Sequence, residues 1–169
     1  MIQIYTGNGK GKTTAAIGLG IRAIGHGYKV LMVQFMKGED IYGEIKALKN
    51  IPNFEVYQFG LKTFVKKGDL KEEEIKIAKE GFLFAKEKIM SKNYFLVILD
   101  EINVAIDYGL IPLEDVIELL KNCPKEVEIV LTGRYCPKEL YEYADLVSEI
   151  NEIKHPFQKG YFGRKGIDY

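Results

Sequence analysis

The strongest chemical signal lies near the N-terminus, where a short apolar segment runs directly into a turn rich in glycine and lysine. Residues 13–24 follow this turn, and their content of Ala, Ile and Leu is typical of a helix. Glycines let the turn direct its backbone N–H groups inward, and the helix N-terminus adds a dipole that favours anions. The pattern therefore predicts a site for nucleotide phosphates. The residues that form it are Gly7, Asn8, Gly9, Lys10, Gly11, Lys12, Thr13 and Thr14.

Two residues of this phosphate loop have the most direct chemistry. Lys12 can reach phosphate oxygens with its ammonium, and the Thr13 hydroxyl can hold Mg²⁺. The general pattern G-x-x-x-x-G-K-[ST] places a glycine at position 6, but here Thr6 stands there and Gly7 follows. We therefore expect a variant of the loop. For Lys10, a phosphate contact and an exposed loop lysine are equal alternatives.

A pair of acids forms the second signal. Residues 94–99 predict a buried strand, and Asp100 and Glu101 follow it directly. Beside a phosphate loop, one such carboxylate holds the metal or its water shell, and the other can orient a nucleophile. We predict Thr13, Asp100 and Glu101 as the metal ligands. These residues predict an ATP or GTP site with Mg²⁺ and do not separate a hydrolase, a kinase or another transferase.

The elements that must position these residues alternate along the chain between strand and helix patterns. The predicted strands are residues 2–5, 30–35, 54–59, 94–99, 127–131 and 146–150, and the predicted helices are residues 13–24, 45–49, 70–91, 112–120 and 138–143. This order predicts a single α/β domain over residues 1–169, P-loop NTPase-like (RecA-like), with a mostly parallel sheet and helices on both faces. Ligands of such sheets bind beyond the carboxyl ends of the strands. The phosphate loop, the acidic pair and residues 132–134 should therefore open onto one rim.

Composition narrows the class of protein. The 169 residues suit one domain, and 24 Lys and Arg balance 24 Asp and Glu, which argues against nucleic acid or a membrane surface as a partner. The longest strongly apolar run, residues 94–99, is too short to span a bilayer, and no basic leader precedes an apolar stretch, so we expect a cytoplasmic protein. With two cysteines and two histidines, any metal should be a hard cation on oxygen ligands.

Several separated segments resemble one family, the phosphate-loop ATP:corrinoid adenosyltransferases, also called cob(I)alamin adenosyltransferases. The similar segments are residues 6–16, 22–23, 25–27, 33–35, 37–38, 99–101, 131–134, 144–149, 154–155 and 166–169. They occur in the family's order and cover nearly the whole chain. The displaced glycine of the phosphate loop is the family's own form.

The resemblance implies a particular use of ATP. The family transfers the 5′-deoxyadenosyl group to Co(I) of a reduced corrinoid and releases triphosphate whole. Lys12 and Glu101 are then the implied catalytic residues, with Mg²⁺ or Mn²⁺ held by Thr13 and Glu101 as the triphosphate leaves. Arg134 either contacts the nucleotide or pairs with a surface acid. The resemblance also implies a homodimer and a reduced flavin or flavoprotein as the electron donor.

The corrinoid side has a weaker match. In the family, aromatic residues after the third strand displace the lower axial ligand of the corrinoid, usually in a Gly-Phe-Thr-Trp run. This chain has Gly-Leu-Lys-Thr-Phe at residues 60–64 and no tryptophan. Phe59 and Phe64 are the candidates for corrinoid binding, and a core or hinge role is an equal alternative for both.

The last predicted feature is a basic and aromatic C-terminal tail, residues 154–169. It could bind single-stranded nucleic acid, fold over a flat anionic cofactor, or be a disordered terminus. We favour a lid or a partner contact, since the chain carries no net charge to attract nucleic acid. For the whole protein the leading prediction is adenosyl transfer to a corrinoid. The alternatives are a phosphate-loop ATPase or small-molecule kinase that releases ADP, and a nucleotide-binding regulatory module.

Overall fold

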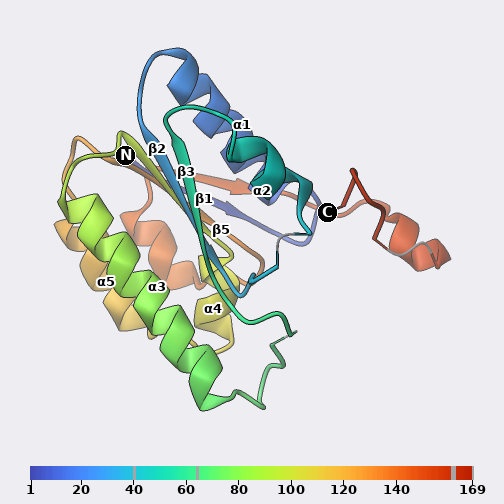
Figure 1. Cartoon of the computed structure of the whole chain (residues 1–169). Coiled ribbons are helices and arrows are strands. Elements are labelled where there is room, and N and C mark those ends of the chain that lie inside the picture. The colour runs from blue at the N-terminus through green and yellow to red at the C-terminus, as the bar shows by residue number, and fades with distance from the viewer. Residues whose placement is uncertain (40, 64, 161–162, 169) are drawn as a thin grey trace.

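The protein is built around one parallel sheet, seen in a computed structural model that describes residues 1–39, 41–63, 65–160 and 163–168 (Figure 1). The six strands are arranged in the order β3-β2-β4-β5-β1-β6, and every neighbouring pair is parallel. The strands are β1 (Ile2–Thr6), β2 (Val30–Phe35), β3 (Phe54–Phe59), β4 (Leu96–Asp100), β5 (Glu128–Thr132) and β6 (Leu146–Glu149). The predicted α/β class with a parallel sheet is confirmed.

Helices cover both faces of this sheet (Figure 1). The helices are α1 (Lys12–Gly25), α2 (Gly43–Leu48), α3 (Glu72–Met90), α4 (Ile102–Asp107), α5 (Leu113–Asn122) and the 3₁₀ helices η1 (Lys138–Tyr143) and η2 (Pro156–Lys159). Side chains of α1 and α2 pack into the core on one face, and side chains of α3, α4, α5 and η1 pack into the core on the other.

The central strands show why the sequence folds this way. All six residues of β2 are buried, as expected for a parallel strand covered on both faces. Their side chains alternate, so that Leu31 and Val33 enter the core beneath α3 while Val30 and Met32 enter the core beneath α1.

Among the described residues, no helix is long and apolar enough to cross a membrane.

The structure contains two short helices that the sequence did not predict, α4 and the 3₁₀ helix η2. The predicted helix over residues 138–143 is present with the same bounds, as the 3₁₀ helix η1. Helix α4 has only six residues and begins directly after Glu101, whose backbone has a φ of 62°. A positive φ at a non-glycine residue has no reliable local sequence signal. The turn that creates α4 is therefore hidden from pattern analysis.

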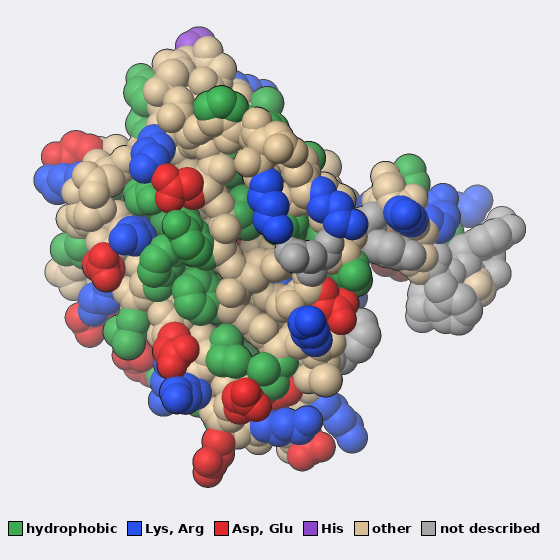
Figure 2. Space-filling model, in the orientation of Figure 1, with side chains coloured by type: hydrophobic (Ala, Val, Ile, Leu, Met, Phe, Trp, Pro, Cys, Tyr) green, Lys and Arg blue, Asp and Glu red, His purple; other side chains and the backbone are tan. Residues whose placement is uncertain are grey.

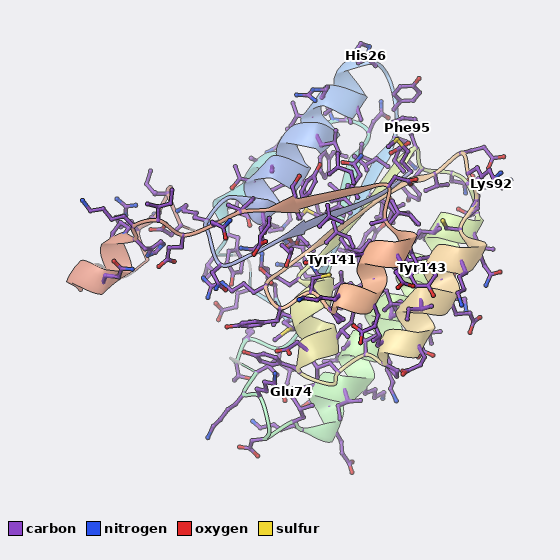
Figure 3. The ribbon with its side chains drawn as sticks, turned by 180° about the vertical axis from the view of Figure 1, so that it is seen from behind. His26, Glu74, Lys92, Phe95, Tyr141 and Tyr143 are labelled. Atoms are coloured by element: carbon purple, nitrogen blue, oxygen red, sulfur yellow. The ribbon has the colours of Figure 1, made fainter. Side chains whose placement is uncertain are left out.

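The two ends of the sheet differ in character. Figure 3 shows His26, Lys92 and Phe95 at the end where β2 and β4 begin. Here Phe95 stacks on Tyr28 with ring centroids 4.0 Å apart. On the face shown in Figure 2, acidic and basic side chains are interspersed. The polar groups that the sequence singled out lie at the opposite end, where the strands finish.

Candidate functional site

The predicted phosphate and metal residues gather around one cavity at the carboxyl ends of the strands. The cavity has a volume of about 970 Å³. Of the residues predicted from the sequence, its lining includes Gly9, Lys10, Gly11, Lys12, Thr13, Thr14, Glu101 and Arg134. The phosphate loop, Glu101 and the end of β5 therefore share one rim, as expected. Gly7, Asn8 and Asp100 are not among the described residues that line the cavity.

The phosphate loop rests on the chain that leaves β6. Gly7 has a φ of 93°, and a Cβ atom there would lie 2.4 Å from the carbonyl oxygen of Ile150. The Gly9 N–H donates to the same oxygen at 2.7 Å. Thr6 is still the last residue of β1, where it pairs with Glu149 of β6. The displaced glycine has a physical reason, because the turn and its closest backbone contact both begin at residue 7.

Helix α1 starts at the bottom of this loop. Its N-terminal cap is Gly11, with a φ of 120°, and no side chain of a described residue caps it. The first N–H groups of the helix therefore remain available to an anion. The Lys12 ammonium is buried and donates to the carbonyl oxygen of Gly9 at 2.6 Å. Burial lowers the pKa of Lys12, while the charge of Glu101 opposes that shift.

Asp100 is fully buried at the centre of a polar group, which we call the Asp100 cluster: Thr13, Gln34, Lys37, Asp100 and Thr132. One carboxylate oxygen accepts hydrogen bonds from the hydroxyls of Thr13 at 2.8 Å and Thr132 at 2.7 Å. The other accepts from the Gln34 amide at 3.0 Å and the Lys37 ammonium at 2.9 Å. Burial acts to raise the pKa of Asp100, but Lys37 and the two hydroxyls outweigh it and the pKa is lowered.

Glu101 has the opposite environment. Its side chain lines the cavity, and its backbone N–H donates to the Thr132 hydroxyl at 3.1 Å. Burial raises the pKa of Glu101, and the neighbouring charge of Asp100 raises it further. A Cβ atom at Gly133 would lie 3.3 Å from a Glu101 carboxylate oxygen, so the glycine leaves room for this side chain. The two predicted acids therefore differ, with Asp100 fully buried and Glu101 facing the ligand space.

Described residues of the C-terminal segment, 154–156, 163–164 and 166–168, form another wall of the cavity. The Lys10 ammonium donates to the carbonyl oxygen of Ile167 at 2.6 Å and to the carboxylate of Asp168. The backbone N–H and the guanidinium of Arg164 donate to Asp168 at 2.9 and 3.2 Å. In this structure Lys10 therefore holds the end of the chain against the phosphate loop.

The aromatic candidates lie elsewhere. Phe59 packs against α3, where a Cβ atom at Gly81 would lie 2.6 Å from its ring. The Phe59 and Phe84 rings are 5.5 Å apart, and Phe59 is not among the described residues that line the cavity. Phe64, the other candidate, lies outside the described residues.

The sequence did not single out several residues that complete the site. Lys37 lines the cavity, and the Gln34 amide donates a hydrogen bond to Asp100. Three tyrosines also line it: Tyr42, Tyr108 and Tyr135. Two sequence signals could have identified Gln34 and Lys37. One is a glutamine inside the apolar strand 30–35, and the other is that segments 33–35 and 37–38 belong to the family resemblance without an assigned role.

Comparison with known proteins identifies the family of the chain. The family described as ATP:corrinoid adenosyltransferase BtuR/CobO/CobP matches residues 1–169. The chain is 38% identical to a corrinoid adenosyltransferase of Escherichia coli strain K12, over the whole chain and 85% of the relative. It is 36% identical to the corrinoid adenosyltransferase CobA of Salmonella typhimurium, again over the whole chain and 85% of the relative. A corrinoid adenosyltransferase of Pseudomonas aeruginosa is 32% identical, over the whole chain and 83% of that protein.

Proposed function

Because the chain belongs to the ATP:corrinoid adenosyltransferase family, we propose that the cavity at the carboxyl rim of its sheet is where the family's reaction takes place. That reaction is the transfer of the 5′-deoxyadenosyl group of ATP to the cobalt of a reduced corrinoid. The observation that carries the placement is the convergence of the phosphate loop, Glu101 and Arg134 on one cavity.

The phosphate loop suits the group that leaves. Co(I) attacks the 5′ carbon of ATP with its electron pair, the bond from that carbon to oxygen breaks, and the oxygen departs as part of triphosphate. The developing charge on that oxygen needs fixed hydrogen-bond donors and cations. In the proposal, the uncapped N–H groups of α1 and the ammonium of Lys12 supply them, and Arg134, which lines the same cavity, supplies a second positive charge.

The metal assignment rests on the oxygen donors. Mg²⁺ takes hard oxygen ligands and commonly combines one or two protein groups with phosphate oxygens and water. Among the described residues no cluster of three or more His, Cys, Asp or Glu side chains forms a metal site. We propose that Thr13 and Glu101 hold Mg²⁺ or Mn²⁺ together with the triphosphate. Asp100, whose oxygens accept from four side chains, then acts on the metal through Thr13 or the water shell.

Further partners follow from the chemistry. Co(I) must be generated by reduction, and we propose a reduced flavin or flavoprotein as the donor. A homodimer and a cytoplasmic location remain predictions from the family resemblance and the sequence. Phe59 and Phe64 remain the proposed aromatic contacts of the corrinoid.

The decisive experiment is an anaerobic incubation with Mg²⁺-ATP and a chemically reduced corrinoid. We expect the Co(I) absorption bands to disappear, a light-sensitive cobalt–carbon product to form, and triphosphate to be released intact. A parallel reaction with a chelator in place of Mg²⁺ tests the metal. Release of ADP and phosphate with an unchanged corrinoid would contradict the proposal and favour the ATPase or kinase. Tight nucleotide binding without turnover would favour the regulatory module.

A further inference from the structure

Lys37 occupies a position that the phosphate loop and the acidic pair leave unexplained. It follows β2, which lies between β3 and β4 in the sheet, and its side chain lines the cavity. Its ammonium lies 2.9 Å from one carboxylate oxygen of Asp100, and the Thr13 hydroxyl lies 2.8 Å from the other. Lys37 is therefore a close neighbour of the hydroxyl proposed to hold the metal.

The backbone on both sides of Lys37 is held by close contacts with the chain that follows β3. Met36 has a φ of 60°, and its N–H donates to the carbonyl oxygen of Phe59 at 3.0 Å. A Cβ atom at Gly38 would lie 2.1 Å from the carbonyl oxygen of Gly60, and one at Gly60 would lie 2.4 Å from the Lys37 nitrogen. The chain leaving β2 thus passes directly over the chain leaving β3, and two glycines make that approach possible. Backbone strain of this kind is typical of functional sites.

The partners of Asp100 leave the Lys37 ammonium with hydrogen-bond donors for a ligand in the cavity. Two hydroxyls and an amide already donate to Asp100, and the side chain of Lys37 is 15% exposed whereas Asp100 is fully buried. The ammonium therefore contacts Asp100 and the cavity at the same time. An ammonium has three donors, of which Asp100 takes one. The remaining N–H bonds can serve an anion that enters beside Thr13.

We propose that Lys37 is a further catalytic residue that binds the triphosphate of ATP beside Thr13 and stabilises it as the leaving group. Asp100 positions the Lys37 ammonium and the Thr13 hydroxyl through its two oxygens, so the cation and the metal ligand are held in one arrangement. This inference rests on the proposed function, because it assigns a role within the same cavity.

The test is calorimetric binding of inorganic triphosphate with Mg²⁺, in the absence of corrinoid. We expect Lys37→Gln to weaken binding about 10- to 100-fold, since it removes a hydrogen bond between charged groups. Lys37→Arg should retain most of the affinity. The matched control is Lys29→Gln, because Lys29 precedes β2 at the opposite end of the sheet and pairs with the partly exposed Glu55.

A double variant separates this role from a purely structural one. Lys37→Gln leaves Asp100 without its cation, so the loss could come from a destabilised cluster. In Lys37→Gln/Asp100→Asn both charges are gone, and we expect the unfolding free energy to recover while triphosphate affinity stays below that of Asp100→Asn alone. Equal affinity of these two variants would overturn the proposal for Lys37. Failure of the wild-type protein to bind triphosphate or ATP would instead contradict the proposed function.

Discussion

Two walls of the same cavity are held in opposite ways. The Asp100 cluster joins α1, β4, β5 and the end of β2 through a carboxylate that is fully buried and accepts four hydrogen bonds. The Lys10 side chain, which is 46% exposed, joins the C-terminal segment to the phosphate loop through Ile167 and Asp168. In Figure 1 the helix η2 of this segment lies away from the body of the protein, whereas the strands of the cluster lie at its centre.

This difference matches the two substrates of the family. A buried, fully paired polar network is rigid, because each unpaired group in a low-dielectric interior carries a large cost. An exposed ion pair contributes little and exchanges readily with water. We infer that the wall formed by the Asp100 cluster is preformed. The C-terminal segment, in contrast, can separate from the phosphate loop to admit a flat substrate much larger than ATP.

Removal of Asp100 should give the largest effect on stability. In Asp100→Ala the Lys37 ammonium loses its fully buried partner, and breaking a buried pair costs about 3–5 kcal/mol of unfolding free energy. Urea denaturation followed by circular dichroism measures this. Asp168→Ala, its counterpart in the C-terminal segment, should leave the transition midpoint unchanged. If the two variants unfolded at the same urea concentration, the contrast between the walls would be wrong.

The two loop lysines should differ in their effect on the reaction. Lys12→Ala removes the buried ammonium that we propose binds the triphosphate, and we expect kcat to fall about 100- to 1,000-fold. Lys10→Ala removes an exposed contact to the C-terminal segment, and we expect kcat to stay within about fivefold. Steady-state kinetics with saturating ATP measures both. A loss from Lys10→Ala as large as that from Lys12→Ala would show that Lys10 turns from Asp168 to the phosphates.

Substitution of one glycine in the phosphate loop and one in the C-terminal segment should give a smaller difference in stability. Gly7 combines a φ of 93° with a Cβ position 2.4 Å from the Ile150 carbonyl oxygen, so Gly7→Ala should cost about 1–3 kcal/mol of unfolding free energy and weaken ATP binding. Gly166 has a φ of 79° but no heavy atom within 4 Å of its Cβ position. Gly166→Ala should leave global unfolding unchanged, because strain in a terminal segment is relieved locally. Thermal unfolding and calorimetry with ATP distinguish the two.

The central strands, the phosphate loop and the acidic pair could be predicted from the sequence because their signals are local. Residues 30–35 and 54–59 were predicted as strands, and β2 and β3 have the same bounds. The phosphate loop lies between a strand and a helix within one short segment, and Asp100 and Glu101 directly follow an apolar run. Periodicity and motif spacing are enough to find features of this kind.

The partners of Asp100 could not be found in the same way. Lys37 and Gln34 lie 63 and 66 positions from Asp100 in the chain, and they meet it only because β2 and β4 are neighbours in the sheet. The strand order itself is not encoded in any local pattern. The contact of Lys10 with Asp168 joins residues 158 positions apart and likewise has no sequence signal.

The smallest effect concerns the attachment of the C-terminal segment. The hydrogen bond from Lys10, followed by that from the Arg164 N–H, holds the pKa of Asp168 well below its usual range. A carboxyl group with a lowered pKa keeps its contact above its ordinary pKa and loses it only as the pH falls through the lowered value. Protection of residues 154–168 from proteolysis should therefore be constant between about pH 5 and 8.

Salt concentration, unlike pH, should weaken the attachment of the C-terminal segment to the phosphate loop. At about 1 M salt an exposed ion pair is strongly screened, so cleavage within the C-terminal segment should accelerate, and Asp168→Asn should have a similar effect at low salt. Neither change should alter the hydrogen exchange of the β4 amides beside Asp100, since buried pairs are screened much less. Mass spectrometry of timed digests and of exchanged peptides measures both regions in one sample. Equal acceleration in β4 and in the C-terminal segment would mean that the two walls open as a single unit.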